Sequence, residues 1–377
     1  MKTEKTLKSG RSAAESLLAL ISFAAVMGLI ALPSGAREKT ALFSAYAAFP
    51  QGGYALLRSY MDVLGEIDAE DERPPGPPVR SGLKTAVSDD ITETPPDILV
   101  LMEEAEKKAP SERKDGDITG KTYGRTSATS VFGNVLVRNM TSTKSMNIEK
   151  VLNEDMGLVI RDKTKPGVLI FHTHTTEGYE TLDRGWYASD TSSRSTDPNK
   201  NVVRVGREIA ARLELAGFTV IHDETIHDLV YSGSYDRSRR TIQKYLDEYP
   251  ELQVVLDVHR DSIQENNGTK IKPVAEINGK KAAQIMLLTG AEEGSVKDFP
   301  NWQYNLRFAL RLQKACEDTA PGLMRPVYFC QRKYNLDMTK YSLLLEMGSE
   351  ANTLEEAAYA GRLIGRALAQ LLEECVT

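Results

Sequence analysis

The chain has 377 residues, of which 41% are apolar and 27% charged, a composition that suits a folded domain better than a disordered polymer. Its formal net charge of -6, with the basic residues scattered, excludes a general attraction to nucleic acid, so we expect no nucleic-acid partner. Three widely spaced cysteines are too few for a disulfide framework or a cysteine-based zinc finger.

An apolar run near the N-terminus predicts a membrane anchor. Residues 17–32 form an apolar run without any charged residue, broken only by Ser22 and Gly28, and Lys2, Lys5, Lys8 and Arg11 precede it. The run is close to the roughly 17–25 residues that span a bilayer, and small flanking residues can extend it. The positive-inside rule keeps the basic tail in the cytoplasm and places the rest of the chain outside. A signal peptide cleaved near residues 34–36 is the alternative, and both interpretations predict export.

Composition divides the chain into four parts. We expect a basic tail with a single transmembrane helix at 1–36, a juxtamembrane segment at 37–66, a flexible stalk at 67–124 and a folded domain at 125–377. The stalk is expected because prolines and acids at 70–78, with few apolar residues, cannot bury enough surface to offset ordering. A short helix near 98–108 is the one element expected within it.

Apolar runs alternate with amphipathic segments in the folded domain. We expect strands at 131–140 (a pair), 167–171, 218–221, 252–258, 283–289 and 342–346, and helices at 199–216, 236–249, 301–316 and 354–373. Thr353 and Glu356 have the spacing of a capping box that opens the last helix. Asn278 and Gly279 predict a turn. Strands that alternate with helices predict an α/β fold whose sheet is covered on both faces.

Histidines and a glutamate follow two of the expected core strands. His174 and Glu177 come shortly after the strand at 167–171, and His259 comes directly after the strand at 252–258. The carboxyl ends of parallel strands meet at the ligand crevice of an open α/β sheet. Two imidazoles and one carboxylate are the ligand set of a catalytic Zn2+, which keeps a fourth position for water. Each residue alone has an ordinary structural interpretation, and only the combination predicts a metal site.

A hydrolytic zinc site also needs a group that moves the proton of the attacking water. Glu346 ends the very apolar strand at 342–346, so its carboxylate is expected to face the same crevice with a raised pKa. We therefore predict Glu346 as the catalytic acid and base. His222 and His227 are expected to be structural or surface residues.

At these residues the sequence resembles the stage II sporulation protein P family of sporulation cell-wall hydrolases. The resemblance rests on HTHTTEGY (172–179), NVVRVG (201–206), DVHRDS (257–262) and LLLEMGSEAN (343–352), and it covers about residues 130–372. Ser262 departs from the more usual alanine at that place. The resemblance implies a zinc-dependent N-acetylmuramoyl-L-alanine amidase in residues 125–377, with a mixed, mostly parallel central sheet in a three-layer sandwich like that of zinc amidases and carboxypeptidases.

The resemblance also implies roles for individual residues and partners. His174, Glu177 and His259 are the implied Zn2+ ligands, with His172 as a second-shell residue or alternate ligand, and Glu346 is the implied catalytic carboxylate. Arg260 is a candidate for binding a substrate carboxylate or phosphate, although a salt bridge with Asp261 or another acid explains it equally well. The implied substrate is peptidoglycan, and the implied partners are stage II sporulation protein D and other septal proteins. The implied place is the cell membrane, with the catalytic domain in the intermembrane space of the sporulation septum.

Two other functions fit the same residues. One is a zinc endopeptidase or carboxypeptidase that acts on the peptides of peptidoglycan, and the other is a non-catalytic wall-binding scaffold. A degenerate site would be expected to have lost Glu346 or a histidine, and this chain has kept them.

Overall fold

The computed structural model describes residues 88, 90–142, 147–188 and 193–377. All of them belong to the second of two compact units, Pro75–Thr377. The expected anchor, the juxtamembrane segment and the first part of the expected stalk lie outside the described residues. None of the helices in the described part of the chain has the length and apolar content that a membrane crossing requires.

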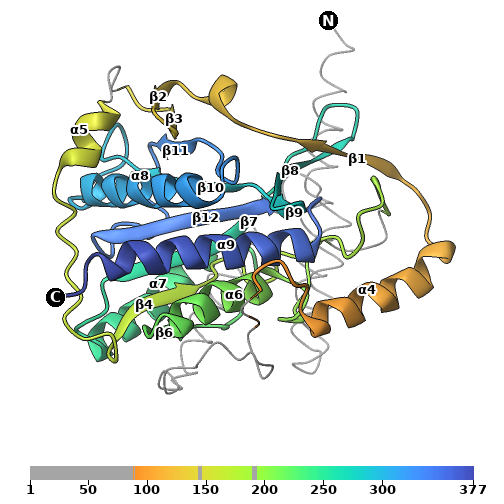
Figure 1. Ribbon diagram of the computed structural model, residues 1–377, viewed down its shortest axis with the longest axis horizontal. Coiled ribbons are helices and arrows are strands. Elements are labelled where there is room, and N and C mark those ends of the chain that lie inside the picture. Colours follow the sequence, from red (N-terminus) through yellow and green to blue (C-terminus); the bar gives the residue numbers. More distant parts are fainter. Residues whose placement is uncertain (1–87, 89, 143–146, 189–192) are drawn as a thin grey trace, which may run out of the picture. The chain divides into compact units, whose positions relative to one another are not determined.

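A mixed sheet of eight strands forms the centre of the described residues (Figure 1). Five of its seven neighbouring pairs are parallel, and the pairs β2–β3 and β10–β12 are antiparallel. In spatial order the strands are β2 (Ser130–Phe132), β3 (Val135–Asn139), β11 (Val327–Cys330), β10 (Ile285–Gly290), β12 (Tyr341–Ser349), β7 (Val254–Asp261), β4 (Pro166–Phe171) and β6 (Thr219–His222). The expected mixed, mostly parallel sheet is confirmed.

Helices cover both faces of this sheet, because the strands are apolar on both sides. Leu256 of β7 belongs to the large core beneath α6, α8 and α9, whereas Val255 belongs to a smaller core with Ile242 of α7 on the opposite face. The helices are α6 (Val202–Leu215), α7 (Ser234–Glu248), α8 (Trp302–Thr319) and α9 (Leu354–Glu373), with a short α5 (Ile148–Asn153) before β4. The expectation of an α/β fold covered on both faces is confirmed.

The start of α9 follows the expected capping box. The Thr353 side chain accepts a hydrogen bond from the Glu356 N–H, and the Glu356 carboxylate accepts one from the Thr353 N–H. Each of these hydrogen bonds is 3.1 Å long. Further along α9, a Cβ at Gly361 would lie 3.1 Å from the Val205 carbonyl oxygen of α6. The two helices therefore pack closely at a glycine, which fixes α6 against the sheet.

A second, four-stranded sheet combines β1, from the N-terminal part of the described residues, with three strands from later in the chain. Its spatial order is β5 (Trp186–Tyr187), β1 (Gly116–Lys121), β8 (Lys270–Ile277) and β9 (Lys280–Ala283). The turn between β8 and β9 has positive φ angles of 51° at Asn278 and 76° at Gly279, as the expected asparagine–glycine turn requires.

The prediction that residues 67–124 form a flexible stalk is wrong for residues 90–124. Helix α4 (Pro96–Lys108) confirms the short helix expected near 98–108. The segment also contains the single turn Ala109–Ser111 and strand β1 of the small sheet, which were not expected, and a further single turn, Arg125–Ser127, follows it. Ile98 of α4 is buried against Leu354 and Ala358 of α9, and the Asp97 carboxylate accepts a hydrogen bond of 2.7 Å from Arg204.

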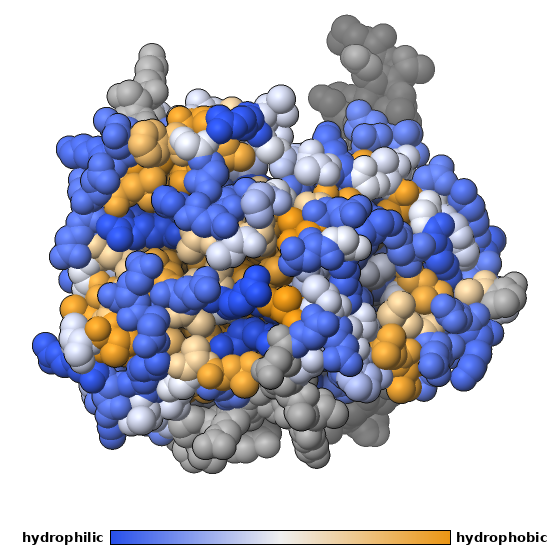
Figure 2. All heavy atoms as spheres, in the orientation of Figure 1, coloured by the Kyte–Doolittle hydropathy of each residue, from blue (hydrophilic) through white to orange (hydrophobic). Residues whose placement is uncertain are grey.

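The apolar residues of this segment are concentrated at 98–102, and composition alone does not reveal that Ile98, Leu101 and Met102 pack in one cluster with α9. On its open side α4 exposes 45% of Leu99 and 53% of Val100, and apolar side chains are visible on this helix in Figure 2.

Candidate metal and hydrolytic site

Two of the expected site residues project from neighbouring central strands. Glu346 of β12 lies directly opposite His259 of β7 in a parallel pair. The residues before them, Leu345 and Val258, point into the core beneath α9. Because side chains alternate along a strand, Glu346 and His259 project together from the other face of the sheet.

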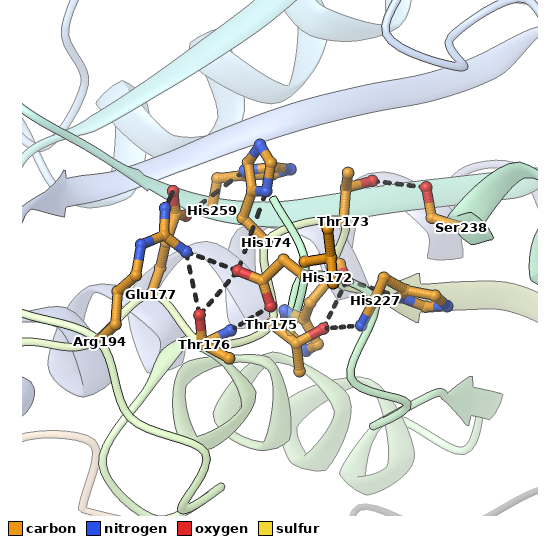
Figure 3. Close-up of polar contacts among 12 residues, drawn as sticks. His172, Thr173, His174, Thr175, Thr176, Glu177, Arg194, His227, Ser238 and His259 are labelled. Carbon is orange, nitrogen blue, oxygen red and sulfur yellow. Dashed lines mark hydrogen bonds and ion pairs between the residues drawn. The ribbon is translucent and has the colours of Figure 1, made fainter. Parts of the chain in front are cut away.

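The loop after β4 brings His174 and Glu177 to the same place (Figure 3). Oε2 of Glu177 lies 3.4 Å from Nδ1 of His259, and the imidazole centroids of His174 and His259 are 5.3 Å apart at right angles. Glu177 is held there by a 3.0 Å hydrogen bond from the Arg260 backbone N–H to Oε2. The structure thus gathers the four predicted residues, with His174, Glu177 and His259 all buried.

Asp257 orients His259 from behind. Its Oδ1 lies 2.8 Å from Nε2 of His259, so the Nδ1 of that ring faces Glu177. The Asp257 carboxylate also accepts hydrogen bonds from the N–H and Oγ1 of Thr173. Burial lowers the pKa of His259, but Asp257 and Glu177 outweigh it and raise this pKa well above its ordinary value. Sequence reasoning missed Asp257, although its place two residues before a candidate ligand on one strand was a usable signal.

The Glu346 carboxyl lies in an environment that disfavours its charge. Oε2 is shut off from solvent and has no hydrogen-bond partner among the described residues. Burial raises the pKa of Glu346 to about 8, the charges of Asp261 and Glu177 add to the rise, and His259 opposes it. A carboxyl with such a pKa can both accept and donate a proton near neutral pH.

The His174 ring is fixed between aromatic side chains. It stacks on Tyr231 with centroids 4.5 Å apart and meets Tyr235 edge-on at 5.6 Å. Its Nδ1 is buried without a hydrogen-bond partner in the described part of the chain, 3.9 Å from Oδ2 of Asp228. Burial and the neighbouring His259 lower the pKa of His174, which favours the neutral imidazole that a metal requires.

The residue types fit Zn2+, although within the described ranges no three His, Cys, Asp or Glu side chains already converge as a metal-binding group. Two imidazoles and a carboxylate are suitable donors, and the unpartnered Nδ1 of His174 is a buried atom that a metal would satisfy. The Asp257 carboxylate stands 2.8 Å from Nε2 of His259, where a metal-ligating histidine commonly has a carboxylate partner, but in the described part of the chain this Nε2 makes no hydrogen bond of good geometry.

His172 lies on the other side of the sheet. Its Nδ1 is 2.9 Å from the Val258 carbonyl oxygen, and its Nε2 is 2.9 Å from Nε2 of His222. A Cβ at Gly206 of α6 would meet both rings, so this pair fills the space beneath that helix. His172 is therefore placed apart from His174 and Glu177. His227 contacts the His172 carbonyl oxygen and Thr241, which confirms it as a structural residue.

The Arg260 guanidinium holds the loop that carries Glu177. It donates to the carbonyl oxygens of Gly178 at 2.8 Å and Ser193 at 2.9 Å, and the residue is 7% exposed. The Asp261 carboxylate accepts a 2.9 Å hydrogen bond from Arg325 and is not the partner of Arg260, whereas Oε2 of another acid, Glu350, lies 4.0 Å from Nη1 of Arg260. Arg260 is thus engaged with the protein itself in this structure.

The fold and the residues on β7, β12 and the loop after β4 define an α/β protein with a candidate metal site and a nearby half-buried acid. The sequence model of the Stage II sporulation protein P (SpoIIP) family matches residues 87–369. The chain therefore belongs to the SpoIIP family. The curated Stage II sporulation protein P of Bacillus subtilis (strain 168) is 33% identical over 204 residues, which cover 51% of this chain and 47% of that protein. The match thus spans about half the length of that relative.

Two solved structures are also similar to this chain. One is an N-acetylmuramoyl-L-alanine amidase of Nostoc punctiforme, with 14% identity, a TM-score of 0.33, and coverage of 57% of this chain and 99% of that chain. The other is the CwlD amidase from Clostridioides difficile in complex with the GerS lipoprotein, with 14% identity, a TM-score of 0.33, and coverage of 55% and 99%.

Proposed function

We propose that this protein is a zinc-dependent N-acetylmuramoyl-L-alanine amidase, which hydrolyses the amide bond between N-acetylmuramic acid and the L-alanine of the peptidoglycan stem peptide. One observation carries the proposal: a half-buried glutamate, whose Oε2 is shut off from solvent and unpartnered in the described part of the chain, stands directly beside His259, on the face that also holds His174 and Glu177. Membership of the SpoIIP family supports a role in sporulation. The amidase reaction is the one that the resemblance to this family implies.

In this proposal His174, Glu177 and His259 hold Zn2+. The bound metal would polarise the scissile carbonyl and lower the pKa of the attacking water. Glu346 takes the proton of that water at Oε2 and delivers it to the leaving amide nitrogen. Asp257 keeps His259 in the orientation that presents Nδ1 to the site.

We further propose that the enzyme works outside the cytoplasmic membrane, where peptidoglycan is found. The apolar run at residues 17–32 supports a membrane anchor for it. Stage II sporulation protein D remains the partner that the family resemblance suggests.

The test is digestion of purified peptidoglycan by the full chain, with and without a chelator, followed by mass analysis of the soluble products. An amidase releases intact stem peptides and leaves the glycan bare, and the chelator abolishes the release. Shortened stems would instead identify a peptidase. Binding to the wall without any zinc-dependent release would identify a scaffold and refute the proposal.

A further inference from the structure

Arg194 stands beside the candidate metal site. Its backbone forms a β-bridge with Glu177, and Nη2 of its guanidinium lies 4.0 Å from Oε1 of that glutamate. Figure 3 shows the Arg194 side chain next to Glu177 and Thr176. A group bound by this guanidinium would therefore lie within one or two residues of the bond that the site is proposed to cut.

The guanidinium is held in a defined orientation. Nη1 donates to Oδ2 of Asp228 at 2.6 Å and to Oγ1 of Thr176 at 3.0 Å. Cζ lies 5.3 Å from the centroid of Tyr231, which in turn stacks on His174. These contacts fix the orientation of the planar guanidinium and place its Nη2 on the side of Glu177. A ligand that binds at Nη2 would therefore restrict the Arg194 side chain little further.

Arg194 is also the accessible one of three arginines near the site. Its side chain is 38% exposed, whereas the side chains of Arg260 and Arg325 are 5% and 10% exposed. Arg260 is engaged with backbone carbonyl oxygens, and Arg325 with the Asp261 carboxylate. Of these three side chains, that of Arg194 is the one most open to a ligand that enters from solvent.

The charges around the site indicate which kind of ligand the Arg194 guanidinium would bind. Glu177, Asp228 and Glu346 are acids close to the site, and a ligand carboxylate next to them is unfavourable unless a cation lies beside it. A partly exposed arginine with a fixed fork matches a carboxylate in charge and in planar geometry. We infer that Arg194 binds a carboxylate of the stem peptide and selects substrates that carry it.

The inference rests on the proposed amidase function. The stem peptide places the α-carboxylate of its second residue about 7 Å from the scissile bond, since two extended residues span roughly that length. Arg194 lies at a compatible distance because its Nη2 is 4.0 Å from a proposed metal ligand. A stem whose second residue carries a carboxamide at that position would offer no charge to the guanidinium.

The experiment compares two soluble muropeptides that differ only at that group, a free α-carboxylate or its carboxamide. We expect the full-length wild-type chain, loaded with zinc, to have a kcat/KM about tenfold or more higher for the carboxylate substrate. Arg194→Gln should remove this preference by losing activity on the carboxylate substrate alone, and Arg194→Lys should keep part of it. Arg307→Gln, which breaks the ion pair between Arg307 of α8 and Glu154 at the end of α5, is the control and should keep the full preference.

The ratio between the two substrates separates recognition from structural damage. A substitution that merely disturbs the loop around Thr176 and Glu177 lowers activity on both substrates equally, and that outcome overturns the inference. So does a wild-type enzyme without any preference, or a preference that persists in Arg194→Gln. Absence of wild-type turnover on both substrates would instead refute the amidase proposal, and the inference with it.

Discussion

Replacing Glu346 with glutamine keeps the shape of the side chain and removes its ability to carry a proton. We expect kcat/KM on muropeptides to fall by about 10²- to 10⁴-fold, the usual contribution of a general acid–base group. Zinc content should stay at the wild-type level, because His174, Glu177 and His259 are untouched. Glu317→Gln is the control, since Glu317 is another acid with a raised pKa but accepts hydrogen bonds at the loop after α8 and should not affect turnover.

The same substitution has a second consequence, for stability. Burial raises the pKa of Glu346 to about 8 from an ordinary value of 4.5, so between these values the folded chain binds this proton more tightly than the unfolded chain. The free energy of unfolding therefore falls as the pH rises through this window, by up to about 1.4 kcal/mol per pH unit. Raising the pH from 5 to 7 should cost the metal-free wild-type protein up to about 3 kcal/mol.

Glutamine has no such proton to lose, so metal-free Glu346→Gln should show a smaller decline. Urea unfolding at pH 5, 6 and 7 in the presence of a chelator measures the difference. Identical pH dependence in the two proteins would contradict the buried carboxyl, and full hydrolytic activity of the variant would contradict the proton-transfer role.

Two further predictions address the metal and the N-terminal helix. His174→Ala should lose bound zinc as well as activity, measured by metal analysis after dialysis, whereas His227→Gln should keep the metal; equal retention would show that His174 is no ligand. Ile98→Ala should lower the free energy of unfolding by about 2–5 kcal/mol, because it leaves a cavity between α4 and α9. The exposed neighbour Leu99→Ala should change it by less than about 0.5 kcal/mol, and similar losses for both would mean that α4 does not dock as described.

Sequence patterns predicted most of the elements that make the core of this fold, but not strands β8, β9 and β11. The strands around 167–171 and 342–346 and the capped helix after Thr353 have strong apolar or capping signals, and each lies within two or three residues of its expected place. β1 and β5 were not predicted, because β1 is polar with one buried residue of six and β5 has only two residues. Their strand conformation depends on partners distant in the sequence, which local patterns do not contain.

Apolar runs that end in a polar residue predicted His259 and Glu346 as site residues. The expectation that the two strands stop there was wrong, because β7 continues to Asp261 and β12 to Ser349, and the register of the two strands places His259 and Glu346 side by side. The roles of His172 and His174 depend on where the strand alternation stops. His172 continues the alternation of Ile170 toward α6, whereas the loop turns His174 to the other face, and this turn has no signature in the sequence.

The position of Glu346 in the middle of the sheet has a consequence for how the site responds to its occupant. β12 is hydrogen-bonded to β10 on one side and β7 on the other, so moving the glutamate backbone would disrupt two ladders at once. His174 and Glu177 stand on a connection that is tied down by individual side-chain contacts. When substrates of different bulk are accommodated, we expect the adjustment to occur in this connection, while the proton-carrying group keeps a fixed position in the scaffold.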